Sequence, residues 1–295
     1  GIADDIVSTT LSVCEQPTIF APAMNYKMWQ NPSVMESVEK LKSMNKIIID
    51  PEKGYLASLH EGEGRLASID TIMNTIRDTL DIKQPLLNKN IIVTAGPTLE
   101  PIDPVRFISN HSSGKMGYAL ADAACNLGAN VTLISGPVHL NSHPEAQLIN
   151  ITTATELLQS FENIDLKKID YIFMCAAVAD YGPIKKEETK IKKETTKLNL
   201  ELKENPDIIK TISNKTNATI IAFALETNQG ISNAKNKLKN KNADFIVLNY
   251  ANEKGAGFNS NTNHVYIYGK NGSEIELKKD RKDRIAHQII DWVIS

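Results

Sequence analysis

The chain has 295 residues, of which 41% are hydrophobic and 23% charged, and its formal net charge is −2. Such a chain can form two ordinary domains with hydrophobic cores, and its near-neutral charge excludes general electrostatic binding to nucleic acid or to an anionic membrane. The cysteines Cys14, Cys125 and Cys175 are far apart and form no CxxC pair. We therefore expect a reducing, cytoplasmic location and neither a disulfide scaffold nor a structural zinc site.

The ends and the apolar runs of the chain give three further expectations. The longest apolar run, Tyr171–Ala179, is too short to span a bilayer, and the chain shows no signal peptide. It begins without Met and inside a helix-like pattern, which indicates a piece of a longer protein.

Short β-branched runs alternate with helical patterns, which predicts an α/β fold with a mostly parallel sheet. The predicted strands are Thr18–Ala21, Lys46–Ile49, Asn90–Thr94, Asn130–Ile134, Gln147–Ile151, Tyr171–Ala176, Thr219–Ala224, Phe245–Asn249 and His264–Tyr268. The predicted helices are Ser33–Met44, Ser68–Leu80, Met116–Leu127, Ala154–Glu162, Pro206–Ser213, Gly230–Asn240 and Lys279–Ile294. The polar segment Asp81–Asn90 separates two such series, so we predict one domain over residues 1–82 and a second over residues 83–295.

The loop Ile108–Gly117, with the sequence ISNHSSGKMG, lies between a predicted strand and a predicted helix. A strand, a glycine-bearing turn and a helix direct backbone N–H groups and a helix N-terminus at an anion. The turn Val93–Thr98 ends a strand in a similar way, and Ser113 is a candidate cap for the helix. The alternative is a tight turn that caps a helix and binds no ligand. We predict a phosphate-binding loop, because two such turns accompany the basic segment Lys185–Lys197.

This loop matches neither common phosphate fingerprint. A Walker A loop, GxxxxGK[ST], needs Ser or Thr directly after GK, where this chain has Met116. A dinucleotide fold carries an acidic residue after its second strand to bind the ribose, where this chain has Ser135-Gly136-Pro137. The sequence therefore predicts a nucleotide phosphate site of another kind.

Other candidate groups follow the later strands. Asp180 ends an apolar strand, at the edge where parallel sheets usually bind ligands, although a turn residue explains it equally well. Lys237 and Lys241 are spaced for one helix face and could contact a triphosphate or form a solvated stripe. Lys190 belongs to the basic segment, which we interpret as a lid, and Pro206 is expected near the first position of its helix.

No nucleophile–base arrangement can be read from the sequence, and His139 and His143 lack a third metal-ligand candidate nearby, so we predict no protein-built metal site. Lysines around a phosphate-binding loop fit phosphoryl or nucleotidyl transfer, in which positioning and charge neutralisation carry catalysis.

Five ordered motifs make a family resemblance specific. The segments VTAGPTLEPIDPVRFISNHSSGKMG (Val93–Gly117), AAVADY (Ala176–Tyr181), KIKK (Lys190–Lys193), NPDI (Asn205–Ile208) and GFNS (Gly257–Ser260) closely resemble phosphopantothenate–cysteine ligase. In bacteria this is the carboxy-terminal half of a bifunctional coenzyme A biosynthesis protein. The resemblance covers residues 86–295 and implies a Rossmann-like, mostly parallel sheet.

The segments GIADDI (Gly1–Ile6), APAMNYKMWQNP (Ala21–Pro32) and GYLASLHEGEGRL (Gly54–Leu66) resemble the second half of a flavin-dependent phosphopantothenoylcysteine decarboxylase, a partial α/β flavodomain. Ser58 stands where that family has its catalytic cysteine, and a hydroxyl is far less acidic than a thiol. Asn25 and Met28 match the substrate-contacting positions. We therefore expect this part to be inactive as a decarboxylase in this chain and its FMN pocket to be incomplete.

The ligase resemblance implies that 4′-phosphopantothenate and L-cysteine are joined with CTP and Mg²⁺, through an acyl-cytidylate, by a homodimer; an intact flavodomain implies a higher oligomer. It implies that Asn110 and Lys190 are catalytic and that Arg106, Asn110 and Ala177 bind the substrate. The implied nucleotide-binding residues are Gly96, Ser113, Gly114, Lys115, Met116, Met174, Cys175, Ala176, Asp180, Lys190, Asn205, Pro206, Asp207, Phe223, Lys237 and Lys241. The alternatives are a nicotinamide-dependent oxidoreductase and a non-catalytic nucleotide- or flavin-binding module.

Overall fold

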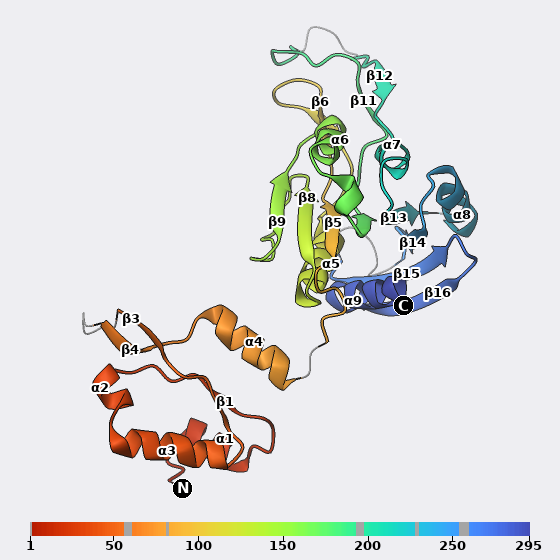
Figure 1. Cartoon of the computed structure of the whole chain (residues 1–295). Coiled ribbons are helices and arrows are strands. Elements are labelled where there is room, and N and C mark those ends of the chain that lie inside the picture. The colour runs from red at the N-terminus through yellow and green to blue at the C-terminus, as the bar shows by residue number, and fades with distance from the viewer. Residues whose placement is uncertain (1, 56–60, 81–82, 193–197, 228–229, 254–259) are drawn as a thin grey trace. The chain divides into compact units, whose positions relative to one another are not determined.

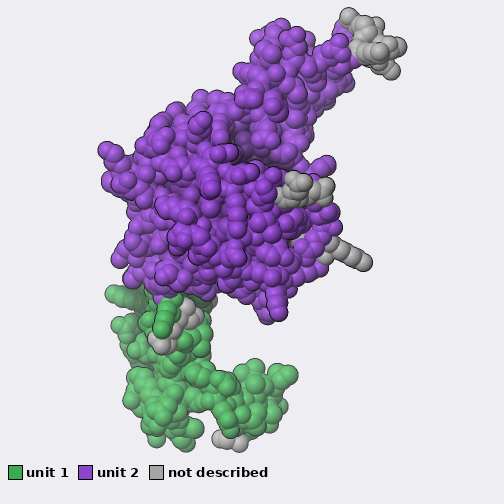
Figure 2. Space-filling view, turned by 90° about the vertical axis from the view of Figure 1, so that its right-hand side faces the viewer, with its two compact units in different colours: residues 1–83 green, residues 84–295 purple. Residues whose placement is uncertain are grey.

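The structure is a computed structural model that describes residues 2–55, 61–80, 83–192, 198–227, 230–253 and 260–295. The chain divides into two compact units, Gly1–Lys83 (unit 1) and Gln84–Ser295 (unit 2), which Figure 2 shows in separate colours. Figure 1 labels their helices and strands.

Unit 1 is built from short elements. They are α1 (Ile6–Val13), β1 (Ile19–Phe20), α2 (Tyr26–Trp29), α3 (Pro32–Ser43), β2 (Ile47–Ile48), β3 (Glu52–Tyr55), β4 (Glu61–Arg65) and α4 (Ile69–Thr79). β1 pairs in parallel with β2, and β3 pairs in antiparallel with β4. Side-chain caps start the helices: Asn31 accepts from the backbone N–H of Ser33 before α3, and Ser68 accepts from that of Thr71 before α4.

Unit 2 contains the large sheet. Its strands are β5 (Asn90–Ala95), β6 (Leu99–Pro101), β7 (Phe107–Ser109), β8 (Asn130–Ser135), β9 (Gln147–Asn150), β10 (Tyr171–Met174), β11 (Tyr181–Pro183), β12 (Leu202–Glu204), β13 (Thr219–Glu226), β14 (Phe245–Tyr250), β15 (Thr262–Gly269) and β16 (Glu274–Arg281). Its helices are α5 (Lys115–Asn126), α6 (Ala154–Glu162), the 3-10 helix Leu166–Lys168, α7 (Ile208–Ser213), α8 (Gly230–Asn240) and α9 (Lys282–Ile294).

In the part of unit 2 that the structure describes, eight strands form one sheet in the order β16-β15-β14-β13-β10-β5-β8-β9. All neighbours from β14 to β9 are parallel, and β15 and β16 are antiparallel additions. The chain proceeds from β5 outward to β8 and β9, then returns beside β5 as β10 and proceeds the other way. This order is that of a Rossmann fold and confirms the α/β prediction.

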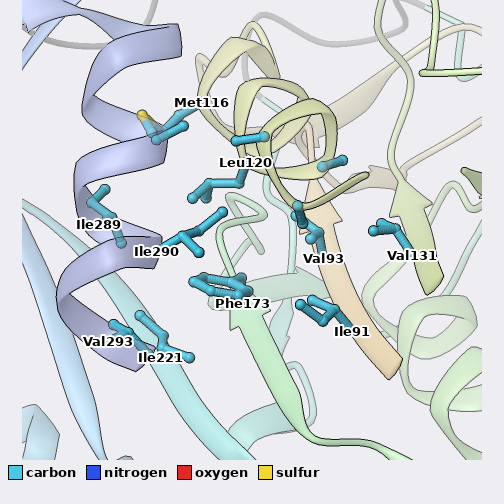
Figure 3. Close-up of a cluster of buried hydrophobic side chains, with 14 of the residues drawn as sticks. Ile91, Val93, Met116, Leu120, Val131, Phe173, Ile221, Ile289, Ile290 and Val293 are labelled. Carbon is cyan, nitrogen blue, oxygen red and sulfur yellow. The ribbon is translucent and has the colours of Figure 1, made fainter. Parts of the chain in front are cut away.

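Both faces of the sheet are covered, which explains the nearly continuous apolar strands. Ile91 and Val93 of β5 belong to a core under α5 and α9, whereas Ile92 between them belongs to a second core under α6, α7 and α8. Figure 3 shows the first core, in which Phe173 and Ile221 meet side chains of α9. Successive side chains of β5 point to opposite faces of the sheet, so neighbouring residues of this strand belong to different cores.

Two boundaries predicted from the sequence are wrong. The last helix was expected from Lys279, but β16 extends to Arg281 as the antiparallel partner of β15, and α9 begins at Lys282. Pro206 was expected near the first position of its helix, but α7 begins at Ile208, and Asp207 is its cap.

A part of unit 2 projects beyond the sheet. β6 pairs with β7, β11 pairs with β12, and these two-stranded ribbons extend together to one side in Figure 1. We call residues 99–109 and 181–204, as far as described, the arm. None of these four strands was predicted, because each is only three residues long. No helix among the described residues is long and apolar enough to cross a membrane.

Gly117 allows α5 to pack closely on β5, because a Cβ atom at this position would lie 2.6 Å from the Cβ of Ala95. We expect Gly117→Ala to destabilise unit 2 by about 1–3 kcal/mol through overpacking, although alanine is favoured over glycine in a helix by about 1 kcal/mol. Urea unfolding measures the change. The control is Asn126→Ala at the exposed end of the same helix; if Gly117→Ala instead matched or exceeded the parent in stability, the packing argument would be wrong.

Candidate functional site

Unit 2 has a cleft of about 730 Å³ at the carboxyl ends of β10, β13 and β14. The strand order reverses between β5 and β10, and ligands of open α/β sheets bind beside such a reversal. The lining residues are Asn110, Ser112–Gly117, Met174–Tyr181, Glu204–Ile209, Phe223–Leu225, Lys237, Lys241, Asn249, Asn263 and Lys282.

The structure brings most of the predicted site residues to this cleft. Those that line it are Asn110, Ser113, Gly114, Lys115, Met116, Met174, Cys175, Ala176, Ala177, Asp180, Asn205, Pro206, Asp207, Phe223, Lys237 and Lys241. Gly96, Arg106 and Lys190 do not belong to the lining residues.

The predicted phosphate loop forms the wall that leads into α5. Gly114 has φ = +73° and is the N-cap of α5, without a side-chain hydrogen bond to the first turn. That Ser113 caps this helix stays a prediction. Gly114, Lys115, Met116 and Gly117 line the cleft, so the positive end of the helix dipole lies beside it and favours an anion there. The ammonium of Lys115 donates to Oδ1 of Asn261 at 2.7 Å.

The turn after β5 supports the opposite wall instead of lining the cleft. The hydroxyl of Thr94 accepts from the backbone N–H of Ala176 at 3.0 Å, and that of Thr98 accepts from Ala179 at 3.0 Å. The carbonyl of Gly96 accepts from the N–H of Ala177 at 2.8 Å. Gly96 therefore fixes the loop 174–180 from behind and does not reach the cleft itself.

Asn110 connects the two walls. Its amide nitrogen donates to the carbonyl oxygens of Ala177 at 3.3 Å and Val178 at 3.0 Å. Two carbonyl acceptors identify this end of the side chain as the nitrogen. The arrangement places the side chain of Asn110 beside the small residues of the loop, among the cleft-lining groups.

The segment before α7, from Glu204 to Asp207, forms a third side of the cleft. Asn205 donates its amide nitrogen to the carbonyl of Ala179 at 2.8 Å, and its backbone N–H donates to the carbonyl of Asp180 at 2.8 Å. Asp207 caps α7 by accepting from the backbone N–H of Lys210 at 3.2 Å. The carboxylate of Asp180 lies at an exposed position on the cleft.

The lysines of α8 reach the cleft as predicted, and each has an acidic partner. The ammonium of Lys237 lies 2.9 Å from Glu226, and that of Lys241 lies 3.7 Å from Asp207. Burial raises the pKa of Glu226, but the hydrogen bonds from Asn233 and Lys237 together with the Lys237 charge lower it by more. The pKa of Glu226 therefore lies below its usual value. These carboxylates hold the two lysines at the cleft.

Sequence reasoning missed one cation of the cleft. Lys282, the first residue of α9, lines the cleft and is only 7% exposed. The charged run KKDRKDR around it is typical of a solvated segment and gives no signal of a buried side chain. Near it, burial raises the pKa of the Cys175 thiol to about 12, so this thiol is protonated at neutral pH and is a poor nucleophile.

Arg106 and Lys190 lie on the arm. The buried carboxylate of Asp103 accepts from the backbone N–H groups of Val105 at 2.8 Å, Arg106 at 2.8 Å and Ile191 at 3.1 Å. The guanidinium of Arg106 lies 3.5 Å from this carboxylate and donates to the carbonyl of Ile191 at 3.3 Å. Arg106 therefore holds the segment that carries the exposed Lys190, and in this structure it does not line the cleft.

Unit 1 holds the remaining predicted residues. Asn25 caps α2 by accepting from the backbone N–H of Lys27 at 2.9 Å, and the side chain of Met28 is 57% exposed. Ser58 lies outside the described residues.

Two further observations limit the chemistry. Within the described part of the chain, no group of three or more His, Cys, Asp or Glu side chains could hold a metal ion. At the position where a dinucleotide fold has its ribose-binding carboxylate, Ser135 is buried, donates to the carbonyl of Gly136 at 2.8 Å and lies 3.1 Å from the hydroxyl of Tyr118. This position offers no carboxylate to a nicotinamide cofactor.

Comparisons with known proteins agree with the two-unit division. Residues 86–295 match the model of the DNA/pantothenate metabolism flavoprotein C-terminal domain, and residues 1–81 match a flavoprotein model. The coenzyme A biosynthesis bifunctional protein CoaBC of Bacillus subtilis is 40% identical over 299 residues, which cover 100% of this chain and 73% of that protein. A cysteine/cysteine sulfinic acid decarboxylase of an unknown prokaryotic organism is 38% identical over 302 residues, covering 100% of this chain and 84% of that protein.

A solved structure is similar to unit 2. The crystal structure of the C-terminal domain of a coenzyme A biosynthesis bifunctional protein CoaBC has a TM-score of 0.60 and 37% identity. The match covers 72% of this chain and 97% of that chain.

We expect Asp103→Asn to lower the melting temperature at neutral pH, because the amide has one acceptor oxygen in place of the two that accept from Val105, Arg106 and Ile191, and it carries no charge to pair with Arg106. Burial raises the pKa of Asp103, but hydrogen bonds from Val105, Ile191 and Arg106, together with the Arg106 charge, lower it below 3.8. The carboxylate therefore stabilises the folded state above that pH and loses this contribution as the pH falls through the lowered pKa.

The gap in melting temperature between the parent and Asp103→Asn should accordingly be constant near neutral pH and narrow below about pH 4. Thermal unfolding followed by circular dichroism measures it. Asp165→Asn, at an exposed carboxylate, is the control. A gap that stayed constant down to the lowest pH at which the protein folds would contradict the assignment.

Proposed function

The chain belongs to the family of coenzyme A biosynthesis bifunctional proteins and is a ligase of that family, and we propose that unit 2 joins 4′-phosphopantothenate to L-cysteine using CTP. One observation carries the proposal: a single cleft gathers the N-terminus of α5, several lysines and a loop of small residues at the reversal of the strand order. These are the groups that a nucleoside triphosphate and an anionic substrate need.

The proposed reaction has two steps. A carboxylate oxygen of 4′-phosphopantothenate attacks the α-phosphorus of CTP, and pyrophosphate leaves to give an acyl-cytidylate. The amine of cysteine then attacks the acyl carbon; the amide bond forms, CMP leaves with the electron pair of the broken bond, and the amine loses a proton. Neither step needs a protein nucleophile, which fits the protonated Cys175 thiol.

In this proposal the two walls have different tasks. The first turn of α5, from Gly114, binds phosphate oxygens through backbone N–H groups, and Phe223 with the loop 174–180 contacts the nucleoside. Asn110 lies between these walls and hydrogen-bonds the acyl-cytidylate. Lys190 and Arg106 lie outside the cleft lining, so their proposed contacts with the ligands require the arm to approach the cleft.

The lysines of α8 neutralise the triphosphate. Lys237 and Lys241 are held by Glu226 and Asp207 in this structure, and phosphate oxygens are competing acceptors for both. Carboxylate and phosphate oxygens both form charge-assisted hydrogen bonds with lysine, so the triphosphate can take the place of these partners.

Mg²⁺ enters the proposal with the nucleotide. Mg²⁺ in nucleotide sites is usually bound by one or two carboxylates together with phosphates, and the carboxylates of Asp180 and Glu204 line the cleft. These residues would hold the ion, which neutralises charge on the triphosphate.

For unit 1 we infer a flavoprotein-type module, and FMN binding by it stays a prediction. The apolar side chains that the described part of unit 1 buries are Trp29, Val38, Ile49, Pro51 and Ala67, a small set beside the extensive cores of unit 2. These side chains do not by themselves enclose a flavin ring, so we derive no decarboxylation step for this unit. The homodimer through unit 2 and a cytoplasmic location also stay predictions.

The ligase proposal is tested by pyrophosphate release. With 4′-phosphopantothenate, cysteine, Mg²⁺ and CTP, we expect pyrophosphate and phosphopantothenoylcysteine in equal amounts, and ATP in place of CTP tests the nucleotide. The control omits 4′-phosphopantothenate, which removes the attacking carboxylate. Release with neither nucleotide would sink the ligase proposal, and equal rates with both would sink the preference for CTP.

The role proposed for Asn110 predicts a split between the two steps. Asn110→Ala should still release pyrophosphate slowly in a single turnover without cysteine, but overall product formation should fall by about a hundredfold or more. Rapid-quench measurement of the acyl-cytidylate and of product separates the steps. Asn163→Ala, at an exposed residue that does not line the cleft, is the matched control. Turnover of Asn110→Ala at the parent rate would refute this role.

A further inference from the structure

A buried carboxamide at the cleft has no task in the proposed reaction. Asn263, the second residue of β15, lines the cleft and is only 3% exposed. Val265 and Ile267 follow it on the same face of the strand and belong to the core under α5 and α9. Asn263 therefore continues an apolar row of this core with a polar side chain, at the point where the row reaches the cleft.

Two donors fix the orientation of this side chain. Its carbonyl oxygen Oδ1 accepts from the backbone N–H of His264 at 3.1 Å and from the amide nitrogen of Asn249 at 3.4 Å. These donors identify this end of the carboxamide as the oxygen. The pairing of β15 with β16 also shifts its register between Asn263 and Val265, and such irregularities re-aim side chains beside active sites.

The amide nitrogen has no strong acceptor in the part of the chain that the structure describes. Nδ2 of Asn263 carries two hydrogens, and the acceptor that it reaches among these residues is Sδ of Met116, at 3.7 Å. A thioether is a weak acceptor, so this buried donor loses hydrogen bonds that water would give it. A leucine would fill a similar volume without this loss, so packing of the core does not account for the amide.

The same nitrogen lies beside a helix terminus that favours an anion. Met116 is the second residue of α5, in its first turn, and lines the cleft together with Gly114 and Lys115. The N-terminus of a helix carries partial positive charge and favours phosphate. An anion bound at this turn would also supply the acceptor that the amide of Asn263 lacks.

We propose that Asn263 donates a hydrogen bond from Nδ2 to a phosphate oxygen of the ligand bound at the first turn of α5. This inference rests on the proposed function and adds to it a neutral phosphate contact. The phosphate belongs either to the triphosphate of the nucleotide or to 4′-phosphopantothenate, because both offer charged oxygens. The amide contributes a direct hydrogen bond to a charged group and adds no charge to that of the cleft lysines.

Isothermal titration calorimetry with CTP and, separately, with 4′-phosphopantothenate tests the inference. Asn263→Leu removes the donor at similar volume, and we expect it to weaken the binding of one of these ligands about ten- to hundredfold. Asn263→Asp keeps an oxygen acceptor for Asn249 and His264 but places a negative charge beside the phosphate, so it should weaken the same ligand further. Asn163→Asp makes the same change of charge at an exposed residue outside the cleft lining and should match the parent with both ligands.

The two ligands together separate phosphate binding from support of the fold. The ligand whose affinity falls identifies the phosphate that the amide contacts, and the other ligand reports whether the cleft is intact. A loss of equal size for both ligands, with a lower melting temperature in their absence, would show that the side chain only supports the cleft and would overturn the inference. Failure of both Asn263 variants to fold would overturn it for the same reason.

Inorganic tripolyphosphate distinguishes failure of this inference from failure of the proposed function. If the parent binds neither CTP nor 4′-phosphopantothenate but binds tripolyphosphate, and Asn263→Leu weakens that binding, the phosphate contact stands and the ligase proposal is wrong. If both variants match the parent for every ligand that the parent binds, the ligase proposal stands and the phosphate contact is wrong. A parent that binds none of the three would overturn both.

Discussion

The reversal of strand order between β5 and β10 is the constraint on which the structure of unit 2 depends. The chain leaves β5 for β8 in one direction and β10 for β13 in the other, and the cleft lies beside this reversal, at the carboxyl ends of β10, β13 and β14. α5 enters on one side, and the loop 174–180 forms the other. The cleft-lining residues of α7, α8 and α9 lie on the same side of the sheet's edge as this reversal, at the carboxyl ends of the parallel strands.

The cations of the cleft differ in how far they are exposed. Lys237 and Lys241 pair with Glu226 and Asp207, and each can exchange this partner for a phosphate oxygen. Lys282, the first residue of α9, lines the same cleft with only 7% of its surface exposed.

The sequence predicted the parallel strands and the helices of unit 2 well, because each carries its own apolar period. It failed where structure depends on partners distant in the chain. β16 contains only Ile275 and Leu277 as inward apolar residues, so its pairing with β15 outweighed a pattern that suggested helix. The arm strands are too short for any period, and nothing in the sequence indicates that Asp103 accepts from Ile191.

The same distinction holds for the site. Residues in recognisable loops, such as Ser113 to Met116 and Asn205 to Asp207, were predicted and do lie at the cleft. Lys282 was missed, because a single lysine in a run of charges shows neither burial nor direction. Gly96 and Arg106 lie in motifs that mark the site, yet in this structure their contacts are with other parts of the protein. A motif identifies a region, and only the fold shows which of its side chains face the ligand.

The hydrogen bonding of the loop 174–180 has a consequence for nucleotide choice. Thr94, Gly96 and Thr98 bind the backbone groups of this loop from behind the wall. The cleft-lining side chains of Asn110 and Asn205 donate to the carbonyls of Ala177, Val178 and Ala179. This wall is preorganised, and a ligand that binds against it pays little conformational entropy for ordering it. Differences in affinity between nucleotides must then come from the direct fit of the base, so its selectivity should resist changes that merely loosen or stiffen the loop.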